Sequence, residues 1–97
     1  MDKAQTLQIL SSRLSEIQRR FAVEHISLFG SVARDEAGSG SDVDILISYR
    51  ETPGLFRFLE LKDFLEKEMN CSVDLVTENA LKKQLRERIM SEAIRVA

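Results

Sequence analysis

The sequence is short of cysteine, of excess charge and of long apolar runs, and each shortage excludes a class of protein. Cys71 is the only cysteine among the 97 residues, so no disulfide can form within the chain and no second thiol is present to complete a zinc site. A single unpaired thiol fits a reducing compartment. We therefore expect the protein to act in the cytoplasm.

The balance of charge argues against a nucleic-acid backbone as the main partner. Fourteen Lys and Arg side chains stand against sixteen Asp and Glu, which leaves a formal net charge of −2. A protein that grips duplex nucleic acid neutralises its phosphates with clustered basic side chains. Duplex nucleic acid is therefore not an expected partner.

No stretch of the chain has the length of a membrane segment. Residues 1–6 lack the basic start and apolar core of a secretory signal, so we expect neither a signal nor a membrane contact. With 43% hydrophobic and 31% charged residues, the composition is that of a soluble globular protein. A chain of 97 residues builds one hydrophobic core, which predicts a single domain over residues 1–97.

The spacing of apolar residues predicts helices that alternate with short strands. Apolar residues three and four apart predict three longer helices, over residues 7–21, 55–69 and 81–96. Short apolar or alternating runs predict three strands, over residues 25–29, 42–48 and 72–76. A short helix is expected to begin within residues 31–36, and Thr77 is a candidate cap of the last helix. The order α-β-α-β-α-β-α indicates an α/β fold with a small mixed or parallel sheet flanked by helices.

Two acidic residues open the second predicted strand. Residues two apart in a strand point to the same side, so Asp42 and Asp44 face together while Val43 and its apolar neighbours face the core. Carboxylates about 7 Å apart along a strand repel each other unless a cation lies between them. Asp74 occupies the corresponding face of the third strand, so three carboxylates converge if the two strands are neighbours.

Such a group of carboxylates suits magnesium, which prefers oxygen ligands and usually binds together with a phosphate substrate. Two ions would hold both the attacking and the leaving oxygen of an in-line displacement. Aspartates that are merely solvated at a strand edge are the alternative. A calcium loop of the EF-hand type is excluded, because the glycine and the distal glutamate of that pattern are missing.

A candidate phosphate site precedes the acids. Gly30 and Ser31 follow a predicted strand and open a predicted helix. At such a corner glycine lets the backbone come close to a ligand, the serine hydroxyl donates a hydrogen bond, and the first helical amides carry partial positive charge. A simple turn at Gly30-Ser31 is the alternative.

Two further residues are candidates for binding phosphate. Arg34 lies three residues beyond the glycine-serine pair, near its face if the segment is helical, and would steady a triphosphate. Its alternative is a surface ion pair with Asp35 or Glu36. Ser41 stands directly before the paired acids, where it would contact either a phosphate or the loop backbone.

Three spaced blocks together resemble the minimal nucleotidyltransferases of the DNA polymerase beta superfamily. They are Leu-Phe-Gly-Ser-Val-Ala-Arg at residues 28–34, Ser-Asp-Val-Asp-Ile-Leu at residues 41–46 and Val-Asp-Leu-Val at residues 73–76. The flanking helices are similar to the family as well, so the resemblance covers nearly the whole chain. It implies the polymerase beta-like fold, a mixed sheet flanked by helices.

The resemblance also implies a role for each candidate residue. Asp42 and Asp44 would ligate the magnesium ions, and Asp74 would ligate a metal ion and help to deprotonate the acceptor hydroxyl. Gly30 and Ser31 would hold the triphosphate, and the reaction would be nucleotidyl transfer with release of pyrophosphate.

One residue departs from the family pattern. Many members carry glycine after the arginine, where this chain has Asp35. The added negative charge near the phosphates is expected to weaken nucleotide binding.

Family members of this length lack the extra domain with which larger relatives hold an acceptor. In the family a small helical HEPN protein often takes that place as the toxin of a toxin and antitoxin pair, and the nucleotidyltransferase transfers AMP from ATP to one of its tyrosines. This role is our leading hypothesis. There are two alternatives: a module that neutralises a toxin by contact alone, and an enzyme that acts on a small molecule. The preferred nucleotide base and a homo-oligomeric state are left open.

Overall fold

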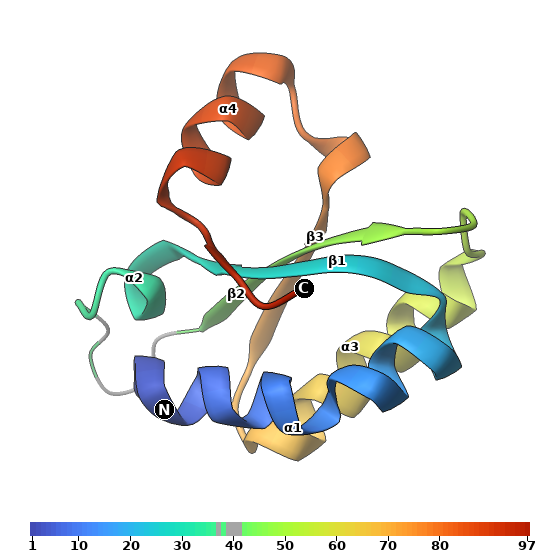
Figure 1. Cartoon of the computed structure of the whole chain (residues 1–97), viewed down its shortest axis with the longest axis horizontal. Coiled ribbons are helices and arrows are strands. Elements are labelled where there is room, and N and C mark those ends of the chain that lie inside the picture. Colours follow the sequence, from blue (N-terminus) through green and yellow to red (C-terminus); the bar gives the residue numbers. More distant parts are fainter. Residues whose placement is uncertain (37, 39–41) are drawn as a thin grey trace.

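The computed structural model describes residues 1–36, 38 and 42–97 and shows a four-stranded sheet with its helices packed around it (Figure 1). The elements follow one another as α1 (Lys3–Phe21), β1 (Val23–Phe29), α2 (Gly30–Ala33), β2 (Val43–Tyr49), α3 (Leu55–Met69), β3 (Val73–Thr77), the 3-10 helix η1 (Glu78–Ala80), α4 (Lys83–Glu92) and β4 (Ile94–Arg95). Among these described residues, no helix is long and apolar enough to cross a lipid bilayer.

The sheet is mixed, which confirms the predicted fold class. Its strand order is β3-β2-β1-β4. β1 runs antiparallel to both β2 and β4, whereas β2 and β3 are parallel. The parallel pair is connected through α3, as parallel strands require a crossover. β2 and β3 are therefore neighbours that start at the same end of the sheet.

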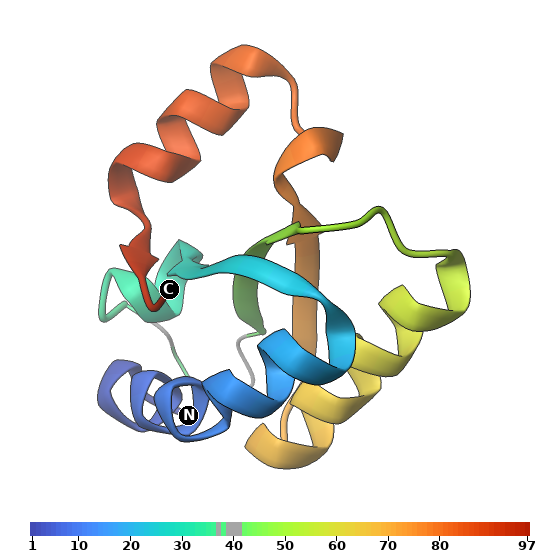
Figure 2. The same ribbon diagram turned by 45° about the vertical axis from the view of Figure 1, so that its right-hand side comes forward.

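One face of the sheet carries the hydrophobic core. Alternate side chains of the strands point to this face, and Ile26, Leu28, Ile45 and Ile47 are fully buried there. α1 and α3 lie next to each other against it (Figure 2). Their buried residues are Thr6, Leu10, Ile17 and Phe21 in α1 and Leu61, Leu65 and Met69 in α3. Burying one large apolar side chain stabilises a fold by about 1.5–3 kcal/mol, so this face holds the domain together.

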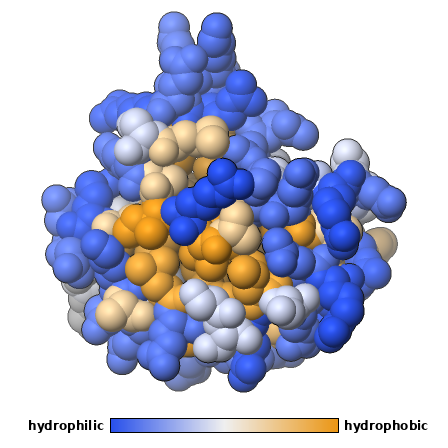
Figure 3. Space-filling view, viewed as in Figure 1, coloured by the Kyte–Doolittle hydropathy of each residue, from blue (hydrophilic) through white to orange (hydrophobic). Residues whose placement is uncertain are grey.

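The opposite face is only partly covered. α4 packs against α2 and β1 on this side, and none of its residues is fully buried. Figure 3 shows apolar surface near the middle of the molecule, whereas Ile94 and Val96 of the C-terminal segment are partly buried against the core, on the face to which the Ile94 partner Leu28 points. The residues of β2 and β3 that alternate with the core residues point to this open face.

α1 begins at Lys3, four residues before its predicted start at residue 7, because a capping box opens it. The Asp2 carboxylate accepts a hydrogen bond from the Gln5 backbone N–H (2.8 Å), and the Gln5 side chain accepts one from the Asp2 N–H (3.1 Å). The first turn also buries Thr6, whose hydroxyl donates to the Asp2 carbonyl (2.7 Å). These contacts are polar, so apolar spacing does not reveal this turn.

The predicted C-terminal helix over residues 81–96 is wrong at both ends. α4 ends at Glu92, and Ile94–Arg95 forms a strand, β4, that pairs with Ser27 and Leu28 of β1. The Val96 N–H continues this contact to the Ile26 carbonyl (2.9 Å). The edge of β1 supplies hydrogen-bond partners that a helix would leave unpaired, and this decides the conformation.

The predicted cap and two smaller boundaries are corrected as well. Thr77 precedes η1, not α4, and its side chain makes no capping hydrogen bond. α2 is a single turn that ends at Ala33. Strand pairing starts at Val43, whose N–H donates to the Ser72 carbonyl (3.0 Å), so Asp42 lies just before β2 instead of inside it.

Candidate active site

Asp44 and Asp74 are brought together by the register of the two parallel strands. In the pairing of β2 with β3, Asp44 and Asp74 are direct partners. Both residues alternate with buried apolar neighbours, so they point to the open face of the sheet. The condition set by the sequence, that these two strands be neighbours, is met. Asp44 is half-buried, whereas Asp74 is exposed to solvent.

Burial and the neighbouring acids both act on the Asp44 carboxyl group. The pKa of Asp44 is raised from 3.8 to about 6, mainly by burial and then by the charge of Asp74, a hydrogen bond with Asp74 and the charge of Asp42. The guanidinium of Arg34 acts in the opposite direction and lowers it. Asp42 is exposed and precedes the strand, yet its charge still reaches Asp44. The three acids therefore carry more negative charge than the nearby Arg34 guanidinium compensates.

A divalent cation would supply the missing positive charge. In the described part of the chain, no three His, Cys, Asp or Glu side chains are arranged to enclose a metal ion by themselves. Magnesium does not require such a cage, because it usually binds through one or two carboxylates and completes its shell with water and phosphate oxygens. The paired Asp44 and Asp74 side chains fit that mode. The roles of Asp42, Asp44 and Asp74 as metal ligands stay a prediction.

Gly30 is packed directly against the Asp44 carboxyl group. A Cβ atom built on Gly30 would lie 2.8 Å from Asp44 Cγ and closer still to one of the carboxylate oxygens. The φ angle of Gly30 is +76°, in the left-handed region that glycine adopts without strain. Glycine is required here both by conformation and by space. The corner between β1 and α2 therefore lies next to Asp44. Phosphate binding by Gly30 stays a prediction.

Ser31 lies in the single turn of α2 and is half-buried. Its carbonyl accepts a hydrogen bond from the Glu36 N–H (2.9 Å), which closes the turn that follows α2. The next residues, Val32 and Ala33, are buried and fix α2 on the domain. Ser41, the other predicted phosphate ligand, lies outside the described residues.

Arg34 forms two ion pairs at the end of α2. Its Nε donates to Glu36 Oε2 (3.1 Å), and its Nη1 donates to Glu92 Oε2 at the end of α4 (3.3 Å). The first pair is the local alternative that the sequence suggested. The second was missed, because nothing in the sequence connects two residues that are 58 positions apart. Binding of a triphosphate by Arg34 stays a prediction.

The backbone explains why glycine suits the position of Asp35. Its φ angle is +62°, which is left-handed. Glycine is the residue best suited to that conformation, and aspartate is among the few others that tolerate it. Asp35 therefore preserves the turn, and its expected effect on nucleotide binding stays a prediction.

Residues with no predicted catalytic role are also accounted for. His25 accepts a hydrogen bond from Arg95 (2.7 Å) and lies 3.3 Å from the Ala97 carbonyl, so it connects β1 to the C-terminal segment. Phe58 and Phe64 are partly buried and pack against the core. Phe56, in contrast, is 81% exposed.

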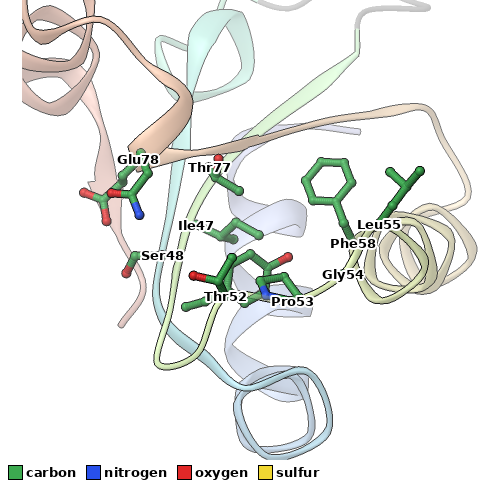
Figure 4. Close-up of a pocket in the computed structure, with 11 residues that line it drawn as sticks. Ile47, Ser48, Thr52, Pro53, Gly54, Leu55, Phe58, Thr77 and Glu78 are labelled. Atoms are coloured by element: carbon green, nitrogen blue, oxygen red, sulfur yellow. The ribbon is translucent and has the colours of Figure 1, made fainter.

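A pocket of about 310 Å³ lies at the other end of β2 and is not part of this site. Leu55 and Phe58 of α3 form one side of it, and Ile47 and Thr77 of β2 and β3 lie opposite (Figure 4). The acids stand at the start of β2 and the pocket at its end, and the three residues from Asp44 to Ile47 span about 10 Å along the strand. The pocket is therefore separate from the group of acids, which lies on the open face.

The fold and the paired acids define the class of protein, and comparison with known proteins agrees. The sequence profile of the nucleotidyltransferase domain matches residues 7–96, and the chain belongs to this family of enzymes. It is similar to protein adenylyltransferase MntA of Thermococcus cleftensis, with 40% identity over 88 residues that cover 91% of this chain and 89% of the relative.

Two solved structures show the same fold. One is a protein assigned as a minimal nucleotidyltransferase, with a TM-score of 0.83, 36% identity and coverage of 97% of this chain and 95% of that chain. The other belongs to the complex of a tri-AMPylated Shewanella oneidensis HEPN toxin with an MNT antitoxin, with a TM-score of 0.68, 20% identity and coverage of 94% of this chain and 71% of that chain. At the latter identity the likeness concerns the fold alone.

Proposed function

We propose that this nucleotidyltransferase transfers AMP from ATP to a hydroxyl group of a protein partner, with magnesium as its metal ion. One observation carries the proposal: Asp44 and Asp74 are paired across two parallel strands on the open face, and Gly30 brings the corner before α2 against them. The acids and the candidate phosphate site are then adjacent, as phosphoryl chemistry requires.

The two paired acids have different positions and so different proposed roles. Asp44 is half-buried beside Gly30 and would hold a metal ion together with Asp42. Asp74 is exposed, so an acceptor hydroxyl arriving from solvent can reach it, and it would take the proton from that hydroxyl while also binding metal. Bound magnesium would stabilise the charge on the attacking and leaving oxygens.

The nucleotide would lie with its triphosphate against the corner that follows β1. Gly30 leaves room for phosphate oxygens, and Ser31 would donate to them through its hydroxyl. Arg34 would contribute positive charge, since its guanidinium already acts on Asp44 electrostatically. Ser41 is proposed as a further ligand on the sequence pattern alone. Pyrophosphate would leave from this side.

The described helices and strands all form the sheet or pack on it, and we propose that the acceptor lies on another molecule. We infer that the partner is a helical toxin of the HEPN class and that its acceptor is a tyrosine. Support comes from the similar adenylyltransferase MntA and from the fold shared with an antitoxin bound to an AMPylated HEPN toxin. The chain would then act as an antitoxin in the cytoplasm.

A labelling experiment tests the reaction. The purified chain is incubated with magnesium, ATP labelled at the α-phosphate, and the HEPN protein encoded beside its gene. We expect label on the partner, no label from ATP labelled at the γ-phosphate, and loss of labelling in Asp44→Asn and in Asp74→Asn. Glu60→Gln, which removes one carboxylate from an exposed ion pair on α3, is the matched control.

Two outcomes would contradict the proposal. Labelling by Asp44→Asn at the parental rate would exclude the acids from the chemistry. Neutralisation of the toxin in a growth assay by the double variant Asp42→Asn, Asp44→Asn would show that contact alone suffices. In that case the chain would be a binding module instead of an acting enzyme.

A further inference from the structure

The guanidinium of Arg34 lies at the end of a long side chain, and the backbone of Arg34 alone does not fix the position of that group. The Arg34 N–H donates to the Gly30 carbonyl (3.1 Å), which ties the backbone to the turn of α2. Several rotatable bonds separate that backbone from the guanidinium, and the side chain is 43% exposed. Contacts at the guanidinium itself must therefore decide where its charge lies.

Two carboxylates make those contacts, and they differ in how firmly they are anchored. Glu36 lies two residues beyond Arg34 in the same turn, so it moves with that turn. Glu92 comes from the last turn of α4, and the residues directly after it pair with β1 as β4. Glu92 is thereby tied to the sheet, and the sheet also carries Asp44 and Asp74. Of the two partners, Glu92 relates the guanidinium to the acids.

The guanidinium keeps the capacity to bind a phosphate while it is paired. It has five N–H donors, and the two ion pairs use one on Nε and one on Nη1. Its turn begins at Gly30, whose carbonyl accepts from the Arg34 N–H and which packs directly against the Asp44 carboxyl group. A nucleotide that binds at the acids would meet a guanidinium that is already ordered, and ordering before binding increases affinity.

We propose that Glu92 is a positioning residue of the nucleotide site, which holds Arg34 toward the triphosphate and couples α4 to the reaction. This inference rests on the proposed function. Both side chains are exposed, and exposed ion pairs contribute little to stability. The effect is therefore expected in nucleotide affinity and not in the stability of the fold.

Binding of magnesium and ATP in the absence of any acceptor tests the inference by calorimetry. We expect Glu92→Gln to weaken binding roughly two- to fivefold, in keeping with the loss of one exposed ion pair. Arg34→Gln should weaken it about tenfold or more, since it removes charged donors to the phosphates. The double variant should bind like Arg34→Gln alone, because Glu92 acts through Arg34.

Further measurements separate positioning from a structural role. Glu92→Asp should retain part of the affinity, and the melting temperature of each Glu92 variant should match that of the parent. In turnover with a partner, Glu92→Gln should raise the KM for ATP and leave kcat nearly unchanged. Glu60→Gln serves as the control, because it changes charge equally and its ion pair with Arg57 lies on α3, against the other face of the sheet.

Three results with Glu92→Gln would overturn the inference. If the Glu92→Gln variant binds ATP as tightly as the parent does, Glu92 has no role in the nucleotide site. Tighter binding would show that Glu92 competes with phosphate for Arg34. An equal loss in the Arg34→Gln background would show that Glu92 acts elsewhere. If the parent binds ATP but labels no partner, only the proposed AMP transfer fails, whereas a parent that binds no nucleotide refutes both.

Discussion

Replacing Asp44 with asparagine is predicted to abolish nucleotidyl transfer and, at the same time, to stabilise the metal-free protein at neutral pH. The pKa of Asp44 is raised from 3.8 to about 6, with burial as the main cause and the charge of Asp74 next. A carboxyl with a raised pKa binds its proton more tightly in the folded state than in the unfolded state. It therefore stabilises the fold when protonated, and that contribution is lost as the pH rises from about 4 to about 6.

The size of the effect follows from the pKa. A rise from 3.8 to about 6 corresponds to a destabilisation of about 3 kcal/mol once the group is ionised. Asp44 is only half-buried, so screening by solvent reduces the expected value to about 1–2 kcal/mol. In a domain of 97 residues this corresponds to an increase in melting temperature of about 5–10 °C. Asparagine has the same shape as aspartate and carries no charge for Asp74 to repel.

Urea unfolding of parent and Asp44→Asn in the presence of a chelator, from about pH 4 to about pH 8, measures this difference. The two proteins should be almost equally stable at the acidic end, and the variant should gain its advantage near neutral pH. Magnesium added without chelator should stabilise the parent more than the variant. An Asp44→Asn variant that is equally or less stable than the parent at about pH 8 would refute the reasoning.

Substitutions at three further positions test the geometry of the site. Gly30→Ala should lose activity and about 1–3 kcal/mol of stability, measured by thermal melting, because its methyl group meets the Asp44 carboxyl and its φ angle is +76°. Asp35→Gly should keep the fold and bind ATP more tightly, whereas Asp35→Ala should be about 1 kcal/mol less stable than Asp35→Gly, since alanine disfavours a φ angle of +62°. Asp74→Asn should lower kcat more than it weakens ATP binding, as a kinetic comparison would show.

The sequence predicts those parts of the fold whose cause lies within the segment itself. α3 was predicted with both of its ends, because apolar residues at helical spacing run from Leu55 to Met69 and Asn70 adopts the left-handed conformation that ends it. β4 could not be predicted this way. Its conformation depends on the open edge of β1, which lies some seventy residues earlier in the sequence, and Ile89, Ala93 and Val96 keep a helical spacing across the break.

In the candidate site, too, the features with a local cause were predicted and those that depend on distant segments were not. Alternation along a strand is local, so it correctly directed Asp44 and Asp74 to the face opposite the core. Asp44 and Asp74 face each other because of the order and register of the strands. From the sequence it followed only that the two acids meet if their strands are neighbours. The partnership of Arg34 with Glu92 depends on the path of α4 and had no signal in the sequence at all.

The two faces of the sheet explain how the fold can hold a group of like charges. α1 and α3 bury their apolar residues on one face only, and a single large side chain buried there contributes about 1.5–3 kcal/mol. The cost of ionising Asp44 on the other face, about 1–2 kcal/mol from burial and from the neighbouring charges, is therefore offset by about one such residue. Because the core does not depend on the open face, the acids can remain close and partly protonated until a cation arrives. Any substitution that relieves the repulsion should consequently stabilise the empty protein and weaken its binding of magnesium and nucleotide.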